Sequence, residues 1–218
     1  LDLVEQMIRV AAGEKLKLKQ TDVKLKGWAI EARVYAEDPF RNFLPSTGRL
    51  VRYREPVGGS SVRVDSGVYE GAEISMFYDP MIAKLVAYGP DRRAATQTMR
   101  EALDAYYIRG LNHNMPFLSA LLGHERFAAG RLTTGFIAEE FPDGFHGVDL
   151  KPEALSDLVA VAAVVHHRYE LRAHERAPHF QANGSAVAGK WVVKLGSEKH
   201  EATVAETAAG FAVIAGRT

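Results

Sequence analysis

Residues 28–35 read Trp-Ala-Ile-Glu-Ala-Arg-Val-Tyr, and their side chains alternate between two kinds. One set is apolar and the other is mostly polar: Trp28, Ile30, Ala32 and Val34 against Ala29, Glu31, Arg33 and Tyr35. Because successive side chains of a strand point to opposite faces, this pattern predicts a β-strand with one buried face. The strand should end at Glu37-Asp38-Pro39, since proline has no amide hydrogen for a sheet ladder.

The flanking sequence predicts short strands mixed with helices. Apolar residues recur at helical spacing over 2–12, 92–106 and 114–122. One face of the second helix carries Ala95, Met99, Ala102 and Tyr106. Further strands are expected over 48–53, 62–65 and 81–88. Neighbouring strands combined with helices in this order favour an α+β fold.

The composition changes near Phe141-Pro142-Asp143-Gly144, which predicts two domains, residues 1–143 and 144–218. The second part should contain a helix over 153–171 and a loop over 184–189. Strands are then expected over 190–195, 200–206 and 210–215. The helix is apolar nearly all round at 158–165, so we expect it to have two packing surfaces. The following strands would cover one of them, and another chain or the helix's own barrel would cover the other.

Composition excludes several classes of protein. The chain has 218 residues, with 27 basic and 27 acidic side chains, so neither a basic nucleic-acid arm nor an acidic tail is expected. It has no cysteine, which excludes a disulfide scaffold, a zinc–thiolate site and a cysteine nucleophile. The longest apolar run, 158–165, is far shorter than the ~20 residues that cross a bilayer.

No metal site is expected, because the adjacent His166 and His167 face different sides of a helix. The chain opens on Leu1-Asp2-Leu3 without a basic and apolar leader, so we expect no signal peptide and interpret it as a segment of a longer polypeptide.

Arg33 is the candidate for chemistry, because it lies in the middle of the predicted strand on the more polar face. A strand would hold its backbone rigidly, and the fork of donors on a guanidinium suits an oxyanion or a carboxylate. The alternative is an ordinary surface ion pair with Glu31 or Glu37. The pattern alone favours that alternative.

Several blocks of sequence resemble biotin carboxylases. They are Gly27–Pro39, Phe43-Leu44-Pro45-Ser46 with Gly48, Arg63–Gly67, and Tyr78–Ile82 with Lys84-Leu85. The opening helix also resembles the helix that follows the family's catalytic Arg/Glu motif, and the whole match covers residues 1–141 in order. Ile108-Arg109-Gly110, His113-Asn114 and Tyr35 look most like the propionyl-CoA carboxylase α branch of that family.

The resemblance implies the C-terminal subdomain of an ATP-grasp ligase, followed by a long helix and the start of an antiparallel β-barrel. Biotin carboxylases use ATP, Mg²⁺ and bicarbonate to carboxylate N1′ of biotin. In this family, the arginine at the position of Arg33 contacts bicarbonate and the biotin ureido oxygen. Asp79 falls in a motif near the biotin pocket, although a turn-capping aspartate is the simpler interpretation. Phe136 falls near a residue that contacts adenine, and a core phenylalanine is an equal alternative.

The resemblance also implies partners. These are a carboxyltransferase β subunit, reached through the region from about residue 145, and a biotin carboxyl carrier domain of the same polypeptide. Such a hetero-oligomer would work in the bacterial cytoplasm or the mitochondrial matrix. The family's ATP lid, magnesium ligands and general base lie upstream of the matching region, so we expect the 218-residue chain alone to be inactive. An acetyl-CoA or methylcrotonyl-CoA carboxylase, or a non-catalytic interaction module, remains open at this point.

Overall fold

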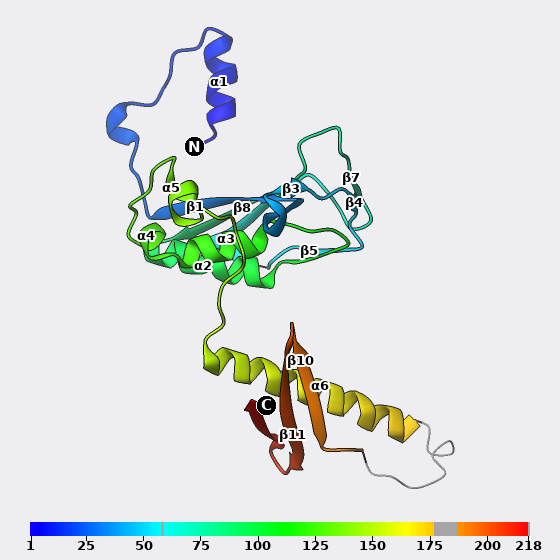
Figure 1. Ribbon diagram of the computed structural model, residues 1–218. Coiled ribbons are helices and arrows are strands. Elements are labelled where there is room, and N and C mark those ends of the chain that lie inside the picture. Colours follow the sequence, from blue (N-terminus) through cyan, green and yellow to red (C-terminus); the bar gives the residue numbers. More distant parts are fainter. Residues whose placement is uncertain (58, 177–186, 218) are drawn as a thin grey trace. The chain divides into compact units, whose positions relative to one another are not determined.

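The computed structural model describes residues 1–57, 59–176 and 187–217 (Figure 1). The chain divides into two compact units, Leu1–Gly147 and Val148–Thr218. The first unit extends past the expected boundary at 143 because Phe145 is buried against other phenylalanines, Phe117 and Phe141 among them. No helix in the described ranges is long and apolar enough to span a membrane.

The first unit is built on a three-stranded antiparallel sheet in the order β1-β8-β6. Its strands are β1 (Trp28–Tyr35), β6 (Val62–Ser66) and β8 (Met81–Gly89). These three strands lie where the alternating pattern predicts them. Three shorter two-stranded pairings lie outside this sheet. They involve β2 (Glu37–Asp38) with β3 (Leu44–Pro45), β4 (Gly48–Arg49) with β7 (Glu73–Ile74), and β5 (Arg52–Arg54) with β9 (Tyr107–Arg109).

The strand predicted over 48–53 is wrong as one element, because β4 and β5 pair with different partners. Leu50 lies between them and is fully buried, so the chain turns its side chain into the core there. The strands β2, β3, β7 and β9 were not expected from the sequence. They have only two or three residues each, too few to show a period of two.

Helices α2 (Arg92–Ala105) and α3 (Met115–Gly123) cover one face of the sheet (Figure 1). All four residues of the predicted face on the first of these helices are buried, namely Ala95, Met99, Ala102 and Tyr106. Asp91 caps α2, since its side chain accepts a hydrogen bond from the amide of Ala94 at 2.8 Å. Two short helices follow, α4 (Glu125–Ala128) and α5 (Phe136–Glu140).

Helix α1 (Leu3–Ala11) begins after Asp2, whose side chain accepts a hydrogen bond from the amide of Glu5 at 3.0 Å. None of its residues is buried within the described chain. Single 3₁₀ turns lie at Gln20–Asp22, Pro39–Arg41 and Gly59–Ser61.

The second unit consists of α6 (Pro152–Arg176) and an antiparallel sheet in the order β10-β11-β12. The strands are β10 (Lys190–Leu195), β11 (Glu198–Thr207) and β12 (Gly210–Arg217). The helix lies across one face of the sheet (Figure 1), with Val159, Ala163, Ala202 and Val204 buried between them. The expected loop over 184–189 lies partly outside the described residues.

Candidate functional site

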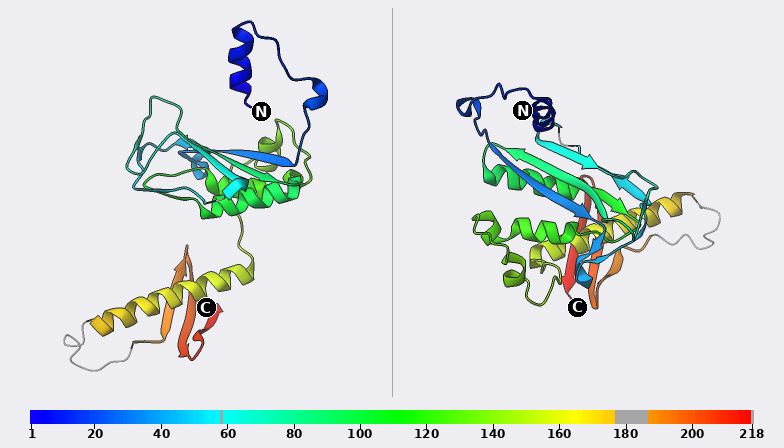
Figure 2. Two further views of the ribbon diagram at one scale, coloured as in Figure 1. Left: turned by 180° about the vertical axis from the view of Figure 1, so that it is seen from behind. Right: turned by 90° about the horizontal axis from the view of Figure 1, so that it is seen from above.

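The open face of the first sheet carries the predicted site residue. Ala32 and Val34 are buried toward α2, so the alternation of β1 turns Glu31, Arg33 and Tyr35 to the opposite face. The right-hand view of Figure 2 looks down on that face. The Arg33 side chain is 60% exposed, and its backbone belongs to a regular strand. The guanidinium is therefore presented to solvent from a fixed base.

The sheet register places two more charged side chains beside Arg33. Lys84 lies directly opposite it on β8, and Asp65 lies opposite Lys84 on β6. Directly paired residues of antiparallel strands share a face, and like charges in such a pair repel. Asp65 also accepts a hydrogen bond from Arg63, two residues before it on β6, at 3.2 Å. The neighbouring cations Arg33 and Lys84 therefore form a surface that suits a bound anion.

Arg33 has two neighbours of its own on β1. Its Nε lies 3.4 Å from Glu31 Oε1, so the surface ion pair that the sequence offered as an alternative is present. Both groups are well exposed, so this pair contributes little to stability. A hydrogen bond with Tyr35 and a second with Glu31 raise the pKa of Arg33, and the guanidinium stays charged. Neither neighbour encloses it, which leaves its donors accessible.

Asp79 lies beside this group, at the entry to β8. Its Oδ1 accepts a hydrogen bond from the amide of Met81 at 3.2 Å, which is the turn-capping role. Its Oδ2 accepts from the Tyr35 hydroxyl at 3.4 Å. Burial and the charge of Asp79 together raise the pKa of the nearby Glu37 carboxyl. Tyr35 thus connects Arg33 with Asp79, and we call these three residues the Arg33 group.

Phe136 lies elsewhere, at the start of α5. Its side chain is 5% exposed, with the Arg126 guanidinium 5.1 Å from its ring centre and the His124 ring 5.3 Å away. Arg126 in turn bonds Glu139 at 2.8 Å and also Glu140, whose pKa it lowers. The ring is therefore enclosed by its own neighbours, as a core phenylalanine is.

The comparisons with known proteins agree with this architecture. The model of the biotin carboxylase C-terminal domain matches residues 31–139, which is half of the chain. The chain belongs to the biotin carboxylase C-terminal domain family. The matched range includes the whole Arg33 group and Phe136.

Curated relatives of this biotin carboxylase domain extend the match into the second unit. The propionyl-CoA carboxylase alpha chain of Ruegeria pomeroyi is 49% identical over 94% of this chain and 33% of its own length. The mitochondrial propionyl-CoA carboxylase alpha chain of Mus musculus is 44% identical over 98% of this chain and 30% of its own. The mitochondrial methylcrotonoyl-CoA carboxylase subunit alpha of Mus musculus is 48% identical over 65% of this chain and 20% of its own. The chain therefore spans about a third or less of the relatives that it matches.

A solved structure shares the fold of the first unit. It is the biotin carboxylase domain of the 2-oxoglutarate carboxylase of Hydrogenobacter thermophilus, in complex with MgADP, ADP and bicarbonate. The likeness has a TM-score of 0.61 at 39% identity, over 64% of this chain and 31% of that one.

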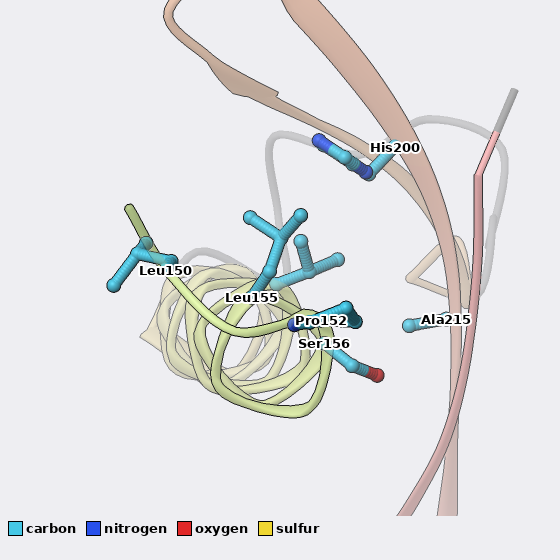
Figure 3. Close-up of a pocket in the computed structure, with 7 residues that line it drawn as sticks. Leu150, Pro152, Leu155, Ser156, His200 and Ala215 are labelled. Atoms are coloured by element: carbon cyan, nitrogen blue, oxygen red, sulfur yellow. The ribbon is translucent and has the colours of Figure 1, made fainter. Parts of the chain in front are cut away.

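The second unit has a cavity of its own, shown in Figure 3. It has a volume of about 340 Å³ and is lined by Leu150, Pro152, Leu155, Ser156, Val159, His200 and Ala215. The His200 imidazole is buried, and its Nε2 lies 3.7 Å from Glu198 Oε2, too far for a hydrogen bond. The lining is otherwise mostly apolar, so this cavity lacks the charged groups that a phosphate or carboxylate substrate needs. The open sheet face of the first unit, in contrast, carries the charged side chains of Arg33 and Lys84.

Arg33 and Asp79 were predicted from the sequence as site residues, whereas Tyr35 and Lys84 were not. Tyr35 could have been assigned from the alternation, since it shares a face with Arg33. Lys84 needed the register between β1 and β8, which the sequence does not give. Across residues 1–57, 59–176 and 187–217, no group of three His, Asp or Glu side chains could hold a metal ion.

Proposed function

We propose that this chain supplies the biotin-facing part of an ATP- and bicarbonate-dependent biotin carboxylase, within the α subunit of an acyl-CoA carboxylase. The observation that carries the proposal is Arg33, held on a strand, charged, and open to solvent on the sheet face of a biotin carboxylase C-terminal domain.

The chemistry assigned to Arg33 follows from charge. Carboxylation at N1′ of biotin requires the loss of its proton, and the resulting negative charge is shared with the ureido oxygen. A fixed cation within hydrogen-bond distance of that oxygen stabilises the charge as it develops. The same guanidinium, with Lys84 beside it, suits the bicarbonate anion. Tyr35 keeps Arg33 and Asp79 in one group, so we assign Asp79 to the wall of the biotin pocket as well as to the turn.

The site for ATP and Mg²⁺ has much less support in this chain than the biotin site has. ATP supplies the phosphoryl group that activates bicarbonate in such enzymes. The described residues offer no carboxylate cluster that fits Mg²⁺, so the proposal gives this chain no Mg²⁺ ligand. The enclosed ring of Phe136 supports a role in the core more than a contact with adenine.

The acyl-CoA that we propose is propionyl-CoA. The support is the extent of the matches: the propionyl-CoA carboxylase relatives align with 94% and 98% of the chain, and so include the second unit. The methylcrotonoyl-CoA carboxylase relative aligns with 65%. Acetyl-CoA and methylcrotonyl-CoA are the alternatives.

We further propose that the second unit, Val148–Thr218, links the carboxylase to a carboxyltransferase β subunit. The strands cover only one side of α6. Large apolar side chains stay exposed on the others, namely Leu158, Val161, Val165 and Tyr169. Such a face needs a cover, which would be the β subunit or further strands of a barrel around the helix. A biotin carboxyl carrier domain of the same polypeptide would deliver biotin to Arg33.

The test uses the complete reading frame that encodes this chain, assayed with free biotin, MgATP and radiolabelled bicarbonate. We expect ATP-dependent carboxylation of biotin. With the co-expressed carboxyltransferase subunit, we expect acid-stable label in the carboxylated product of propionyl-CoA, and less in the products of acetyl-CoA and methylcrotonyl-CoA. No biotin-dependent fixation would overturn the proposed function, and a preference for another acyl-CoA would overturn the substrate alone.

A further inference from the structure

The outer edge of β1 is paired by a side chain instead of a strand. In the sheet order β1-β8-β6, β1 has β8 on one side only. On its other side, Asn114 Oδ1 accepts a hydrogen bond from the Tyr35 amide at 2.9 Å. Asn114 Nδ2 donates to the Arg33 carbonyl at 3.0 Å, and the Asn114 amide donates to the Tyr35 carbonyl at 3.1 Å. One residue therefore makes the bonds that a neighbouring strand would make.

These bonds fall where the sheet itself is irregular. Val34 pairs with Ala83, but the next residue, Tyr35, pairs with Met81, so one residue of β8 is left without a partner. A bulge of this kind disrupts the ladder locally and re-aims the side chains around it. The pairing with β8 is thus interrupted between Val34 and Tyr35, one residue after Arg33. Asn114 supplies support from the opposite edge.

The side chain of Asn114 is suited to this task. It is 7% exposed, and both ends of its amide are used, one as acceptor and one as donor. An amide carries its acceptor and its donor on two separate atoms, so it can reach Tyr35 and Arg33 at the same time, which a single hydroxyl does not. An aspartate of the same shape keeps the acceptor for Tyr35 but turns a carboxylate oxygen toward the Arg33 carbonyl.

We propose that Asn114 is the positioning residue of the Arg33 group. It contacts no reacting atom and acts through the backbone of Arg33 and Tyr35, whose orientation fixes where the guanidinium and the phenol point. This role rests on the proposed function. A displacement of about 1 Å at a reacting group can cost ~10²-fold in rate, so a strand released at this point should be measurably slower.

The experiment compares three variants of the complete polypeptide: Asn114→Asp, Asn114→Ala and the control Asn112→Ala. The Asn112 side chain donates a hydrogen bond to Asp38 Oδ2 at 2.8 Å. Asn112→Ala therefore removes one partly buried side-chain hydrogen bond close to Asn114 in sequence, and it leaves the hydrogen bonds to β1 in place. Three quantities are measured: kcat/KM for free biotin, the KM for ATP, and the rate of hydrogen–deuterium exchange at the Tyr35 amide.

We expect both Asn114 variants to lower kcat/KM for biotin by about 10- to 100-fold while the KM for ATP stays within about twofold. Exchange at the Tyr35 amide should be at least about tenfold faster in Asn114→Ala, since its acceptor is gone. Asn114→Asp keeps that acceptor, and so carries the comparison if the alanine variant does not fold. Asn112→Ala should keep kcat/KM for biotin within about twofold of wild type.

Three results would overturn the inference while the wild type carboxylates biotin. The first is faster exchange at Tyr35 with unchanged biotin kinetics. The second is unchanged exchange at Tyr35 in Asn114→Ala. The third is an equal loss of biotin kinetics in Asn112→Ala. A wild type that does not carboxylate biotin would instead overturn the proposed function, and the role of Asn114 with it.

Discussion

Gly89 sets how closely α2 approaches the sheet, and replacing it gives a sharp test of the packing behind the site. A Cβ at this position would lie 2.4 Å from the Ala95 amide nitrogen and 2.8 Å from the Ala94 carbonyl carbon. Ordinary van der Waals contact begins at 3.4 Å, and both neighbours are backbone atoms that cannot rotate away. The helix would have to withdraw by roughly 1 Å, and Ala95 and Met99, both fully buried, would lose packing.

We expect Gly89→Ala to lower the free energy of unfolding of the first unit by about 1–3 kcal/mol, the usual cost of overpacking. Gly123→Ala is the matched control. No atom lies within 4 Å of a Cβ there, and the residue ends α3. Alanine at that position should leave the free energy of unfolding unchanged or raise it by about 0.5 kcal/mol.

The assay is denaturant unfolding followed by tryptophan fluorescence in a Trp191→Phe background. The chain has two tryptophans, so Trp28 on β1 then reports on the first unit alone. A Gly89→Ala midpoint equal to that of Gly123→Ala would refute the close approach of α2 to the sheet.

Three further predictions concern other parts of the chain. In the second unit, Val164→Glu should misfold the protein because Val164 packs against the core. Val161→Glu, at 60% exposed, should stay folded and still carboxylate free biotin but fail to co-purify with the β subunit. If both variants misfold, α6 is buried on all sides and the proposed partner surface is wrong. At α5, Arg126 lowers the pKa of Glu140, so their pair stabilises the fold above the ordinary carboxyl pKa and is lost as pH falls through the lowered value. The unfolding midpoints of wild type and Glu140→Gln should therefore differ at pH 7 and converge as the pH falls through the lowered pKa of Glu140, and a constant gap would contradict the ion pair. The 218-residue chain alone should hydrolyse no ATP above background, and saturable bicarbonate-stimulated hydrolysis would show that its site is more complete than we propose.

Local pattern was enough to predict the regular elements of this fold. The alternation along 28–35 gave β1 and the face of Arg33, and helical spacing gave the buried stripe of α2. Both signals are periods that a single segment displays by itself. The short pairings β2–β3 and β4–β7 have no such period, and only the partner segment defines them.

The site was predictable only in part, for the same reason. Arg33 could be predicted because it is a charged residue in the middle of a strand. The Arg33 group, however, is formed by contacts between residues that are far apart in the sequence. Asp79 is 44 residues from Tyr35, and Asn114 is 81 residues from Arg33. The sequence also did not show which apolar residues of α6 pack against the sheet and which stay exposed. The apolar run 158–165 includes Val164, which packs against the sheet, and Val161, which is 60% exposed, and the sequence alone does not tell the two apart.

Arg33→Ala in the complete polypeptide tests the central claim most directly. The measurement is the rate of free-biotin carboxylation beside the rate of bicarbonate-dependent ATP cleavage. Arg52→Ala is the control, since Arg52 is 65% exposed and bonds a carboxylate of Glu70 at 2.9 Å, much as Arg33 faces Glu31. A lost charge-stabilising donor typically costs about 10²- to 10³-fold in rate. We predict a loss of that size in biotin carboxylation for Arg33→Ala, with ATP cleavage partly retained and Arg52→Ala close to wild type. Carboxylation by Arg33→Ala within about tenfold of wild type would contradict the assignment of Arg33 to the biotin site.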